Sequence, residues 1–167
     1  MYHYRKNAAV ILINQKNQIL MVQTINAPGK WKFVQGGVKK GEELVDAAKR
    51  EVREEVGLTN IKILAQSKHI HKYDWPKNTQ KEKKKRGQKQ SFFIAIMDKE
   101  SKIKLDLNEL TKYSFFEKNE IYKKAGYKNL KESIEIIQKE FPELLTYTRF
   151  NTISNSKLFR SAVSNTN

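Results

Sequence analysis

Hydrophobic residues in the first part of the chain form short runs that are typical of β-strands. Two apolar runs span 8–13 and 19–22, and the five polar residues 14–18 separate them. Two such runs with a short polar connection predict a β-hairpin. The segment 31–34 alternates apolar and polar side chains, which predicts a third short strand that Gly36 and Gly37 end.

The apolar spacing then changes to that of a helix. Spacings of three and four predict a helix over about 43–56, closed by Gly57, and its apolar positions are Leu44, Val45, Ala48, Val52 and Val56. A second helix is predicted from the same spacing at Leu130, Ile134, Ile137 and Phe141, and Pro142 ends it.

Further strands are predicted between and beside these helices. The segments 61–65 and 69–71 indicate one long strand or two consecutive ones, 91–97 a buried strand, and 103–107 an alternating strand. Strands interleaved with two helices predict an α/β or α+β sandwich.

Composition narrows the class of protein. The chain has 167 residues, 38% of them hydrophobic, and no cysteine, which excludes disulfides, cysteine zinc sites and thiol nucleophiles. It has no long apolar stretch and no signal-peptide pattern at its start, so we expect a cytoplasmic protein without a membrane partner. We expect one domain over 1–145 and a polar tail over 146–167.

Charge is the strongest global feature. The formal net charge is +15, which favours polyanionic partners, although codon usage in an AT-rich genome is an alternative cause. Seven basic residues and one acidic residue lie within 77–89. Such a run is either a solvated loop or a surface that holds an RNA backbone by counterion release.

Candidate chemistry lies on the first predicted helix. Glu51, Glu54 and Glu55 stand at positions i, i+3 and i+4, on one face and close to the helix C-terminus, where negative charge is disfavoured. Three crowded carboxylates repel one another unless a cation joins them, and hard oxygen ligands suit Mg²⁺ or Mn²⁺. The alternative is a solvated acidic helix balanced by Arg50 and Arg53.

Residues 36–58 resemble the Nudix box, Gly-x5-Glu-x7-Arg-Glu-U-x-Glu-Glu-x-Gly-U with U apolar. Every fixed position is met, by Gly36, Glu42, Arg50, Glu51, Val52, Glu54, Glu55, Gly57 and Leu58. The resemblance implies a hydrolase of nucleoside diphosphates linked to another moiety. It also implies an α/β/α sandwich with a mixed β-sheet and a loop–helix–loop catalytic motif.

The same resemblance implies roles for the box residues. The three glutamates would bind Mg²⁺ or Mn²⁺ together with the Gly36 carbonyl, and the first or the last of them would also orient or deprotonate water. Glu42 and Arg50 would orient the loop and the helix through their opposite charges. Glu109, in a loop beyond the helix, is expected to be a further ligand.

Outside the box, residues 5–141 resemble bacterial RNA 5′-pyrophosphohydrolases and the related diadenosine polyphosphate hydrolases. The segments that carry this resemblance are 4–7, 31–37, 72–76 and 87–93. Three features depart from the pattern: Val34 replaces a proline, 23–25 lacks an arginine, and the spacing before Tyr127 is altered.

Substrate contacts follow from this resemblance. Phosphate contacts are expected from Arg5, Lys32, Gln88 and Lys89. Tyr73 and Tyr127 are candidates for stacking on a base, with Lys128 beside them, and the alternative for each tyrosine is half-buried packing.

The predicted function is Mg²⁺-dependent removal of pyrophosphate from the 5′-triphosphate end of RNA, or of phosphate from a 5′-diphosphate end. The alternatives are hydrolysis of dinucleoside polyphosphates or of nucleoside triphosphates, and an RNA-binding module without catalysis. The expected partners are an RNA 5′ end or a dinucleotide, and not DNA.

Overall fold

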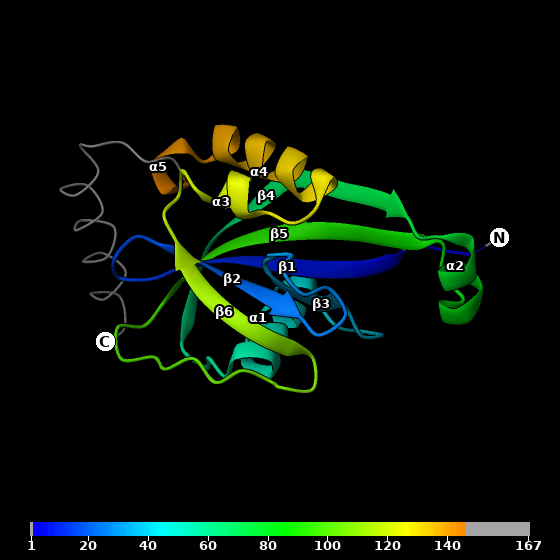
Figure 1. Ribbon diagram of the computed structural model, residues 1–167, viewed down its shortest axis with the longest axis horizontal. Coiled ribbons are helices and arrows are strands. Elements are labelled where there is room, and N and C mark those ends of the chain that lie inside the picture. The colour runs from blue at the N-terminus through cyan, green and yellow to red at the C-terminus, as the bar shows by residue number, and fades with distance from the viewer. Residues whose placement is uncertain (1, 146–167) are drawn as a thin grey trace.

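The computed structural model describes residues 2–145, so the predicted tail over 146–167 lies outside the described residues. Six strands and five helices follow one another along the chain (Figure 1). Their order is β1 (Arg5–Ile13), β2 (Ile19–Thr24), β3 (Val34–Gly37), α1 (Leu44–Val56), β4 (Ile61–Asp74), α2 (Lys77–Lys83), β5 (Gly87–Met97), β6 (Leu110–Phe116), α3 (Ile121–Lys124), α4 (Lys128–Glu140) and α5 (Pro142–Leu145).

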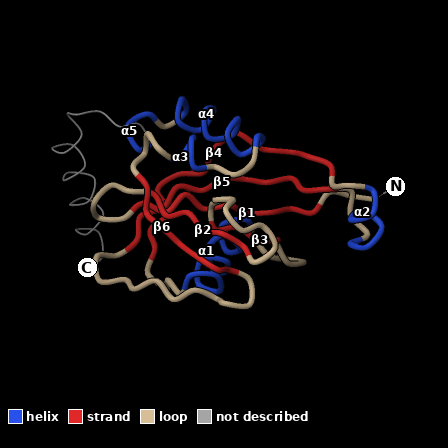
Figure 2. Tube along the Cα trace, in the orientation of Figure 1, coloured by secondary structure: helices blue, strands red, loops and turns tan. Residues whose placement is uncertain are grey.

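The six strands form one mixed sheet in the order β4-β5-β1-β2-β6, with β3 paired to β1 (Figure 2). Strands β1 and β5 are parallel, and the other pairs are antiparallel. One edge of β1 is shared by two partners, since Leu12 lies opposite Leu20 of β2 and Asn7 lies opposite Gly37 of β3. The sheet therefore divides beside β3, and this division leaves room for a site.

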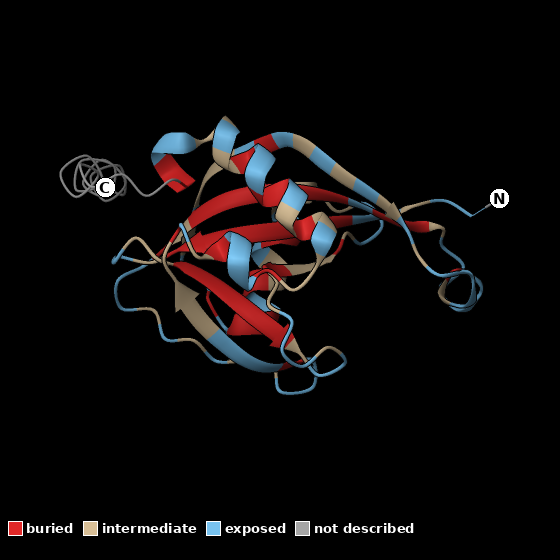
Figure 3. Cartoon of the chain, turned by 45° about the horizontal axis from the view of Figure 1, so that its top comes forward, coloured by how far each residue is buried: buried red, intermediate tan, exposed pale blue. Residues whose placement is uncertain are grey.

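Alternating residues of β1 build the core on both faces of the sheet. Ala8, Val10 and Leu12 pack with Ala48 and Val52 of α1. The intervening residues of β1 pack on the other face with apolar residues of α4 (Figure 3). Because side chains alternate along a strand, one central strand supplies two cores. The predicted α/β/α sandwich with a mixed sheet is confirmed.

The predicted hairpin and the long strand are confirmed. Strands β1 and β2 pair antiparallel across residues 14–18, where the Asn14 side chain accepts hydrogen bonds from the backbone N–H groups of Lys16 and Gln18 at 3.0 and 2.9 Å. The segments 61–65 and 69–71 belong to one strand, β4.

The predicted strand at 31–34 has the wrong bounds. Lys32 exchanges backbone hydrogen bonds with Val22 at 2.8 and 2.9 Å, so residues 31 and 32 form only isolated bridges. The chain then crosses towards β1, and the strand runs over Val34–Gly37. Gly36 and Gly37 therefore belong to the strand that they were expected to end.

The predicted strand at 103–107 is wrong, although its apolar pattern has a real origin. Ile103 and Leu105 pack against the core around α1. The backbone N–H groups of Lys104 and Asp106 donate to the carbonyls of Val56 and Glu55 at 3.0 and 2.9 Å. The segment thus satisfies carbonyls at the C-terminus of α1 instead of pairing with a strand. The next strand is β6, which lies further along the chain.

Strands β4 and β5 form a long hairpin, which we call the ribbon, and β1 pairs along it from Gln88 to Ile96 (Figure 2). The short helix α2 stands at the tip of this ribbon, where the sequence indicated a basic loop. No helix within 2–145 has the length and apolar character needed to cross a membrane.

Candidate active site

Helix α1 places its charged face beside β3. Ala48, Val52 and Val56 bury one side of the helix, which turns the glutamates of the other side towards the division in the sheet. Gly57 ends the helix in the left-handed conformation, with φ of 72°, and donates its N–H to the Arg53 carbonyl. This cap is well suited to glycine.

Glu55 is the most deeply buried of the three glutamates. It is only 3% exposed, and its carboxylate accepts the Gln35 N–H at 3.2 Å and lies 3.7 Å from the Lys32 ammonium. Burial raises the pKa of Glu55 to about 7 despite these two contacts. The surroundings therefore compensate the charge of this carboxylate only in part.

Arg50 connects the box residues to one another. Its guanidinium donates to Glu42 at 2.7 and 3.0 Å, to Glu51 and Glu54 at 2.7 Å each, and to the Gly37 carbonyl at 2.8 Å. The hydrogen bonds from Arg50 lower the pKa of Glu42 to about 2. One cation thus ties the loop before α1 to the helix and holds two of the three clustered carboxylates.

Two glycines of β3 let charged groups lie directly against its backbone. A Cβ at Gly36 would overlap the Glu51 carboxylate, and a Cβ at Gly37 would overlap the Arg5 guanidinium. A side chain at either position would therefore displace a carboxylate or a cation from the site.

A cleft of about 670 Å³ opens beside these glycines. It brings together most of the predicted site residues: Arg5, Lys32, Gly36, Arg50, Glu51, Glu54, Glu55, Gln88 and Glu109. Carboxylates and cations line the same cleft, an arrangement suited to a cation and a phosphate chain side by side. Glu42 lies behind Arg50 and does not line the cleft.

The donors on the acidic side are all oxygens, which suits a hard divalent cation. In the described part of the chain, no three His, Cys, Asp or Glu side chains are already arranged to hold a metal. Glu51 and Glu54 instead turn towards Arg50. The residue types fit such a cation, and binding requires these two carboxylates to reorient.

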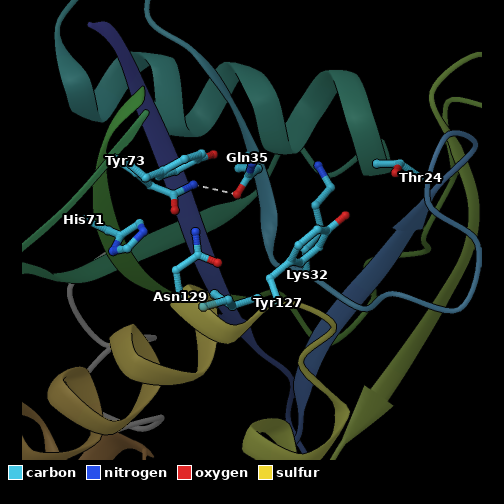
Figure 4. Close-up of a pocket in the computed structure, with 9 residues that line it drawn as sticks. Thr24, Lys32, Gln35, His71, Tyr73, Tyr127 and Asn129 are labelled. Carbon is cyan, nitrogen blue, oxygen red and sulfur yellow. Dashed lines mark hydrogen bonds between the residues drawn. The ribbon is translucent and has the colours of Figure 1, made fainter. Parts of the chain in front are cut away.

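A second pocket of about 270 Å³ adjoins the cleft, and both are lined by Thr24, Lys32 and Gln35. Tyr73 of β4 and Tyr127, just before α4, lie on different sides of it (Figure 4). The structure thus brings together the two predicted stacking residues, which are 54 positions apart in sequence, next to the predicted phosphate contacts.

Polar residues without a predicted role complete this pocket. The Gln90 amide donates to Asn7 at 2.8 Å and to Gln35 at 2.5 Å, which fixes the floor between β1, β3 and β5. His71 and Asn129 also line the pocket. Gln35 and Gln90 belong to the segments that carried the resemblance, so the signal for them was present, whereas Asn129 had none.

Two predicted substrate residues lie outside both cavities. Lys89 is exposed on β5 and points to the face of the sheet opposite Gln88, because neighbouring residues of a strand alternate. Lys128 is exposed at the first residue of α4 and is absent from both linings, whereas Asn129 takes part in one of them.

Comparisons with known proteins agree with this architecture. The family model described as NUDIX domain matches residues 3–136. A curated relative from a Nitratiruptor species, named RNA pyrophosphohydrolase, is 33% identical over 140 residues, which cover 73% of this chain and 90% of the relative. An RNA pyrophosphohydrolase of Francisella tularensis subsp. tularensis is 33% identical over 141 residues, with the same coverage.

Solved structures show the same fold. The E. coli dihydroneopterin triphosphate pyrophosphohydrolase superposes with a TM-score of 0.66 at 20% identity, over 81% of this chain and 99% of that chain. A binary complex of the C. elegans Ap4A hydrolase gives a TM-score of 0.64 at 19% identity, over 81% and 98%. At these identities the likeness concerns the fold alone.

Proposed function

The chain belongs to the Nudix family of hydrolases, which act on phosphoric anhydride bonds, and from this membership we propose that it removes pyrophosphate from the 5′-triphosphate end of RNA. The same proposal covers release of phosphate from a 5′-diphosphate end. Its main support outside the structure is that relatives 33% identical over most of the chain are named RNA pyrophosphohydrolase. A cytoplasmic location follows, because transcripts with such ends are made there.

The observation that carries the proposal is the junction of two cavities. The cleft offers carboxylates and cations to a phosphate chain, and the adjoining pocket offers two tyrosines to a base. Lys32 and Gln35 line both cavities and stand where the first nucleoside would join its phosphates. A 5′-triphosphorylated nucleotide presents these two chemistries in this order.

We assign the metal ligands to Glu51, Glu54, Glu55, Glu109 and the Gly36 carbonyl. A divalent cation held there, Mg²⁺ or Mn²⁺, would polarise phosphoryl oxygens and lower the pKa of the attacking water. Nudix hydrolases in general need a divalent metal. The chain itself contributes the oxygen donors, and Arg50 holds the loop and the helix in register with each other.

Protein groups on the basic side bind and orient the phosphates. Arg5, packed over Gly37, and Lys32, beside Glu55, place two cations along the cleft. Gln88 lines the same cleft as these two cations. Its buried side-chain oxygen has no hydrogen-bond partner within residues 2–145. Glu51 or Glu55 orients the water whose oxygen attacks phosphorus as the anhydride P–O bond breaks.

Hydrolysis of a defined substrate set tests the proposal. The set is triphosphorylated RNA, diphosphorylated RNA, diadenosine tetraphosphate and nucleoside triphosphates, each with Mg²⁺, with Mn²⁺ and with EDTA. We expect the highest kcat/KM on the RNA ends and no turnover with EDTA.

Two other results would contradict the proposal. Preference for diadenosine tetraphosphate would assign the site to dinucleoside polyphosphates, which also present one nucleoside beside a phosphate chain. RNA binding without turnover of any substrate would indicate a binding module, for which three clustered carboxylates have no evident use.

A further inference from the structure

A row of lysines crosses the sheet near the tip of the ribbon, two residues from its last pair, Asp74 and Gly87. Lys89 of β5 lies directly opposite Lys6 of β1 on one side and Lys72 of β4 on the other. Residues paired across neighbouring strands point to the same face, so the three ammonium groups share one face of the sheet. Lys6, Lys72 and Lys89 are all exposed.

This arrangement is costly unless an anion joins it. Like charges placed directly opposite each other on neighbouring strands destabilise a sheet. Within residues 2–145, none of these three lysines lies within ion-pair distance of a carboxylate, and the Lys72 ammonium lies over the ring of Tyr4, at 4.5 Å. The nearby Asp74 is already bound by Tyr4 and Arg86.

The row leads from the cleft to the tip of the ribbon. At the cleft, Val38 donates its N–H to the Lys6 carbonyl at 3.1 Å, and the next residue, Lys39, places its ammonium 3.6 Å from Glu54. At the other end, β4 continues from Lys72 into α2, which carries further lysines. We call Lys39, Lys6, Lys89 and Lys72 the lysine strip.

We propose that the lysine strip binds the phosphodiester backbone of a single-stranded RNA downstream of its 5′ end. This inference rests on the proposed function, because it places the body of the same substrate. The strip and the tyrosine pocket occupy opposite faces of the β1–β5–β4 region, since Gln88 and Tyr73 alternate with Lys89 and Lys72. The RNA body leaves the site at the 3′ oxygen of the first nucleoside, near Lys32 and Gln35, and a single strand is flexible enough to bend from there to the strip.

The chemistry favours a nucleic acid over a protein partner. Lysine is depleted at protein–protein interfaces, whereas lysine contacts to phosphates supply most of the sequence-independent affinity for nucleic acids. Such contacts hold the backbone without reading bases, so the strip should bind RNA of any sequence.

Binding of an RNA that cannot be hydrolysed tests the strip independently of catalysis. The probe is a fluorescent 5′-hydroxyl RNA of about 12 nucleotides, and its Kd is measured by anisotropy at several salt concentrations. Two lost phosphate contacts in the variant Lys6→Gln/Lys72→Gln should reduce the slope of log Kd against log salt by about 1.4. The matched control Lys16→Gln/Lys112→Gln removes the same charge from exposed positions elsewhere on the surface.

The comparison has defined outcomes. An unchanged slope in the strip variant, or an equal loss in the control, would overturn the proposal, as would binding to anionic vesicles with no binding to the RNA. Melting curves of both variants show whether each is folded, and if Lys72→Gln unfolds the chain, Lys6→Gln alone should reduce the slope by about 0.7.

Kinetics then separate the strip from the proposed function. On a triphosphorylated RNA of the same length, the strip variant should have a raised KM and an unchanged kcat, because neither Lys6 nor Lys72 lines the cleft. On a triphosphorylated dinucleotide its KM should match that of the unaltered protein. If the unaltered protein hydrolyses no RNA, the proposed function fails, while the anisotropy result still decides the strip.

Discussion

Arg50 is the residue on which the geometry of the carboxylates depends. Its five hydrogen bonds join the loop before α1, the strand β3 and the helix itself. A metal that binds Glu51 and Glu54 competes with this guanidinium for them. Arg50 would then keep its hydrogen bonds to Glu42 and to the Gly37 carbonyl, which tie the loop before α1 to β3.

Glu54→Gln should lower kcat at least about 10²-fold, because an amide is a weaker ligand for a hard cation than a carboxylate. The side chain of Glu54 is 48% exposed, so loss of its ion pairs should change the free energy of unfolding by no more than about 0.5 kcal/mol. Turnover and thermal melting are measured together. Glu43→Gln is the control, since it removes one exposed charge from the start of the same helix. More than about one per cent of residual activity would contradict the assignment of Glu54 as a ligand.

Tyr73→Ala should raise KM on RNA far more than it lowers kcat. Stacking on a base contributes about 1–3 kcal/mol, which corresponds to roughly a 5- to 150-fold change in binding. The base lies away from the reacting phosphorus, so the contribution is equal in the ground and transition states. Tyr113→Ala, on the exposed edge strand β6, is the matched control. If Tyr73 only packs, its variant will melt earlier and keep its KM.

At the scale of elements, the ribbon of β4 and β5 carries the charge that composition alone could not locate. Residues 72–89 hold eight basic and two acidic side chains. The short helix α2 presents its lysines at the far end of this ribbon, whereas Arg86 is bound to Asp74 at 3.1 Å. Lys83 pairs with Glu82 at 2.8 Å, whereas Lys77, Lys81, Lys84 and Lys85 form no ion pair within residues 2–145 and are available to a ligand. Arg86 has a structural role.

Neutralising the tip should weaken RNA binding and spare small substrates. Replacing Lys77, Lys81, Lys84 and Lys85 by glutamine should reduce the slope of log Kd against log salt by up to about 2.8. Turnover of diadenosine tetraphosphate should hardly change, because α2 stands away from α1 and β3, whose residues line the cleft (Figure 1). The control carries glutamine at Lys16, Lys99, Lys112 and Lys123 and therefore loses the same charge. Equal losses on RNA and on the dinucleotide would place α2 at the catalytic cleft.

The sequence predicted helices and strands well where buried side chains recur periodically. It predicted them poorly where backbone hydrogen bonds determine the local structure. Strand β1 is buried on both faces and its apolar run is unmistakable. Strand β6 lies at an edge with only Leu110 buried, so periodicity carried little signal there. The segment 103–107 has the apolar alternation of a strand, yet its N–H groups bond to carbonyls of α1. Hydrogen-bond partners of this kind cannot be derived from side-chain pattern.

At the scale of the whole molecule, the spacing of the box residues indicated which carboxylates lie together, whereas the order of the strands determines which residues form the pocket beside them. The box residues lie within one loop and one helix, so their spacing in sequence fixes their spacing in space. The pocket beside them combines residues of β2, β3, β4, β5 and α4, and Asn7 of β1 holds Gln90 in place. Asn7, Gln35 and Gln90 meet only because β1 pairs with both β3 and β5. Alternation also decides that Gln88 faces the cleft and Lys89 does not.

Metal binding should stabilise the whole domain, because it relieves charge repulsion that exists only in the folded state. The carboxylates of Glu51, Glu54 and Glu55 are brought together by α1, and in the unfolded chain they separate. A cation at about 100 times its Kd that binds only the folded state adds about 2.7 kcal/mol to the free energy of unfolding. For a chain of this size that corresponds to a rise in Tm of roughly 5–11 °C.

Melting curves with Mg²⁺, with Mn²⁺ and with EDTA measure this effect without any substrate. Sodium chloride at matched ionic strength controls for general screening, which acts on a protein of net charge +15 regardless of any site. We expect EDTA to reverse the rise in Tm and Glu54→Gln to reduce it, while Glu43→Gln retains it in full. An equal rise with sodium chloride, or a full rise in Glu54→Gln, would contradict a metal site at these carboxylates. Because the readout is Tm, the result holds whichever substrate the cleft accepts.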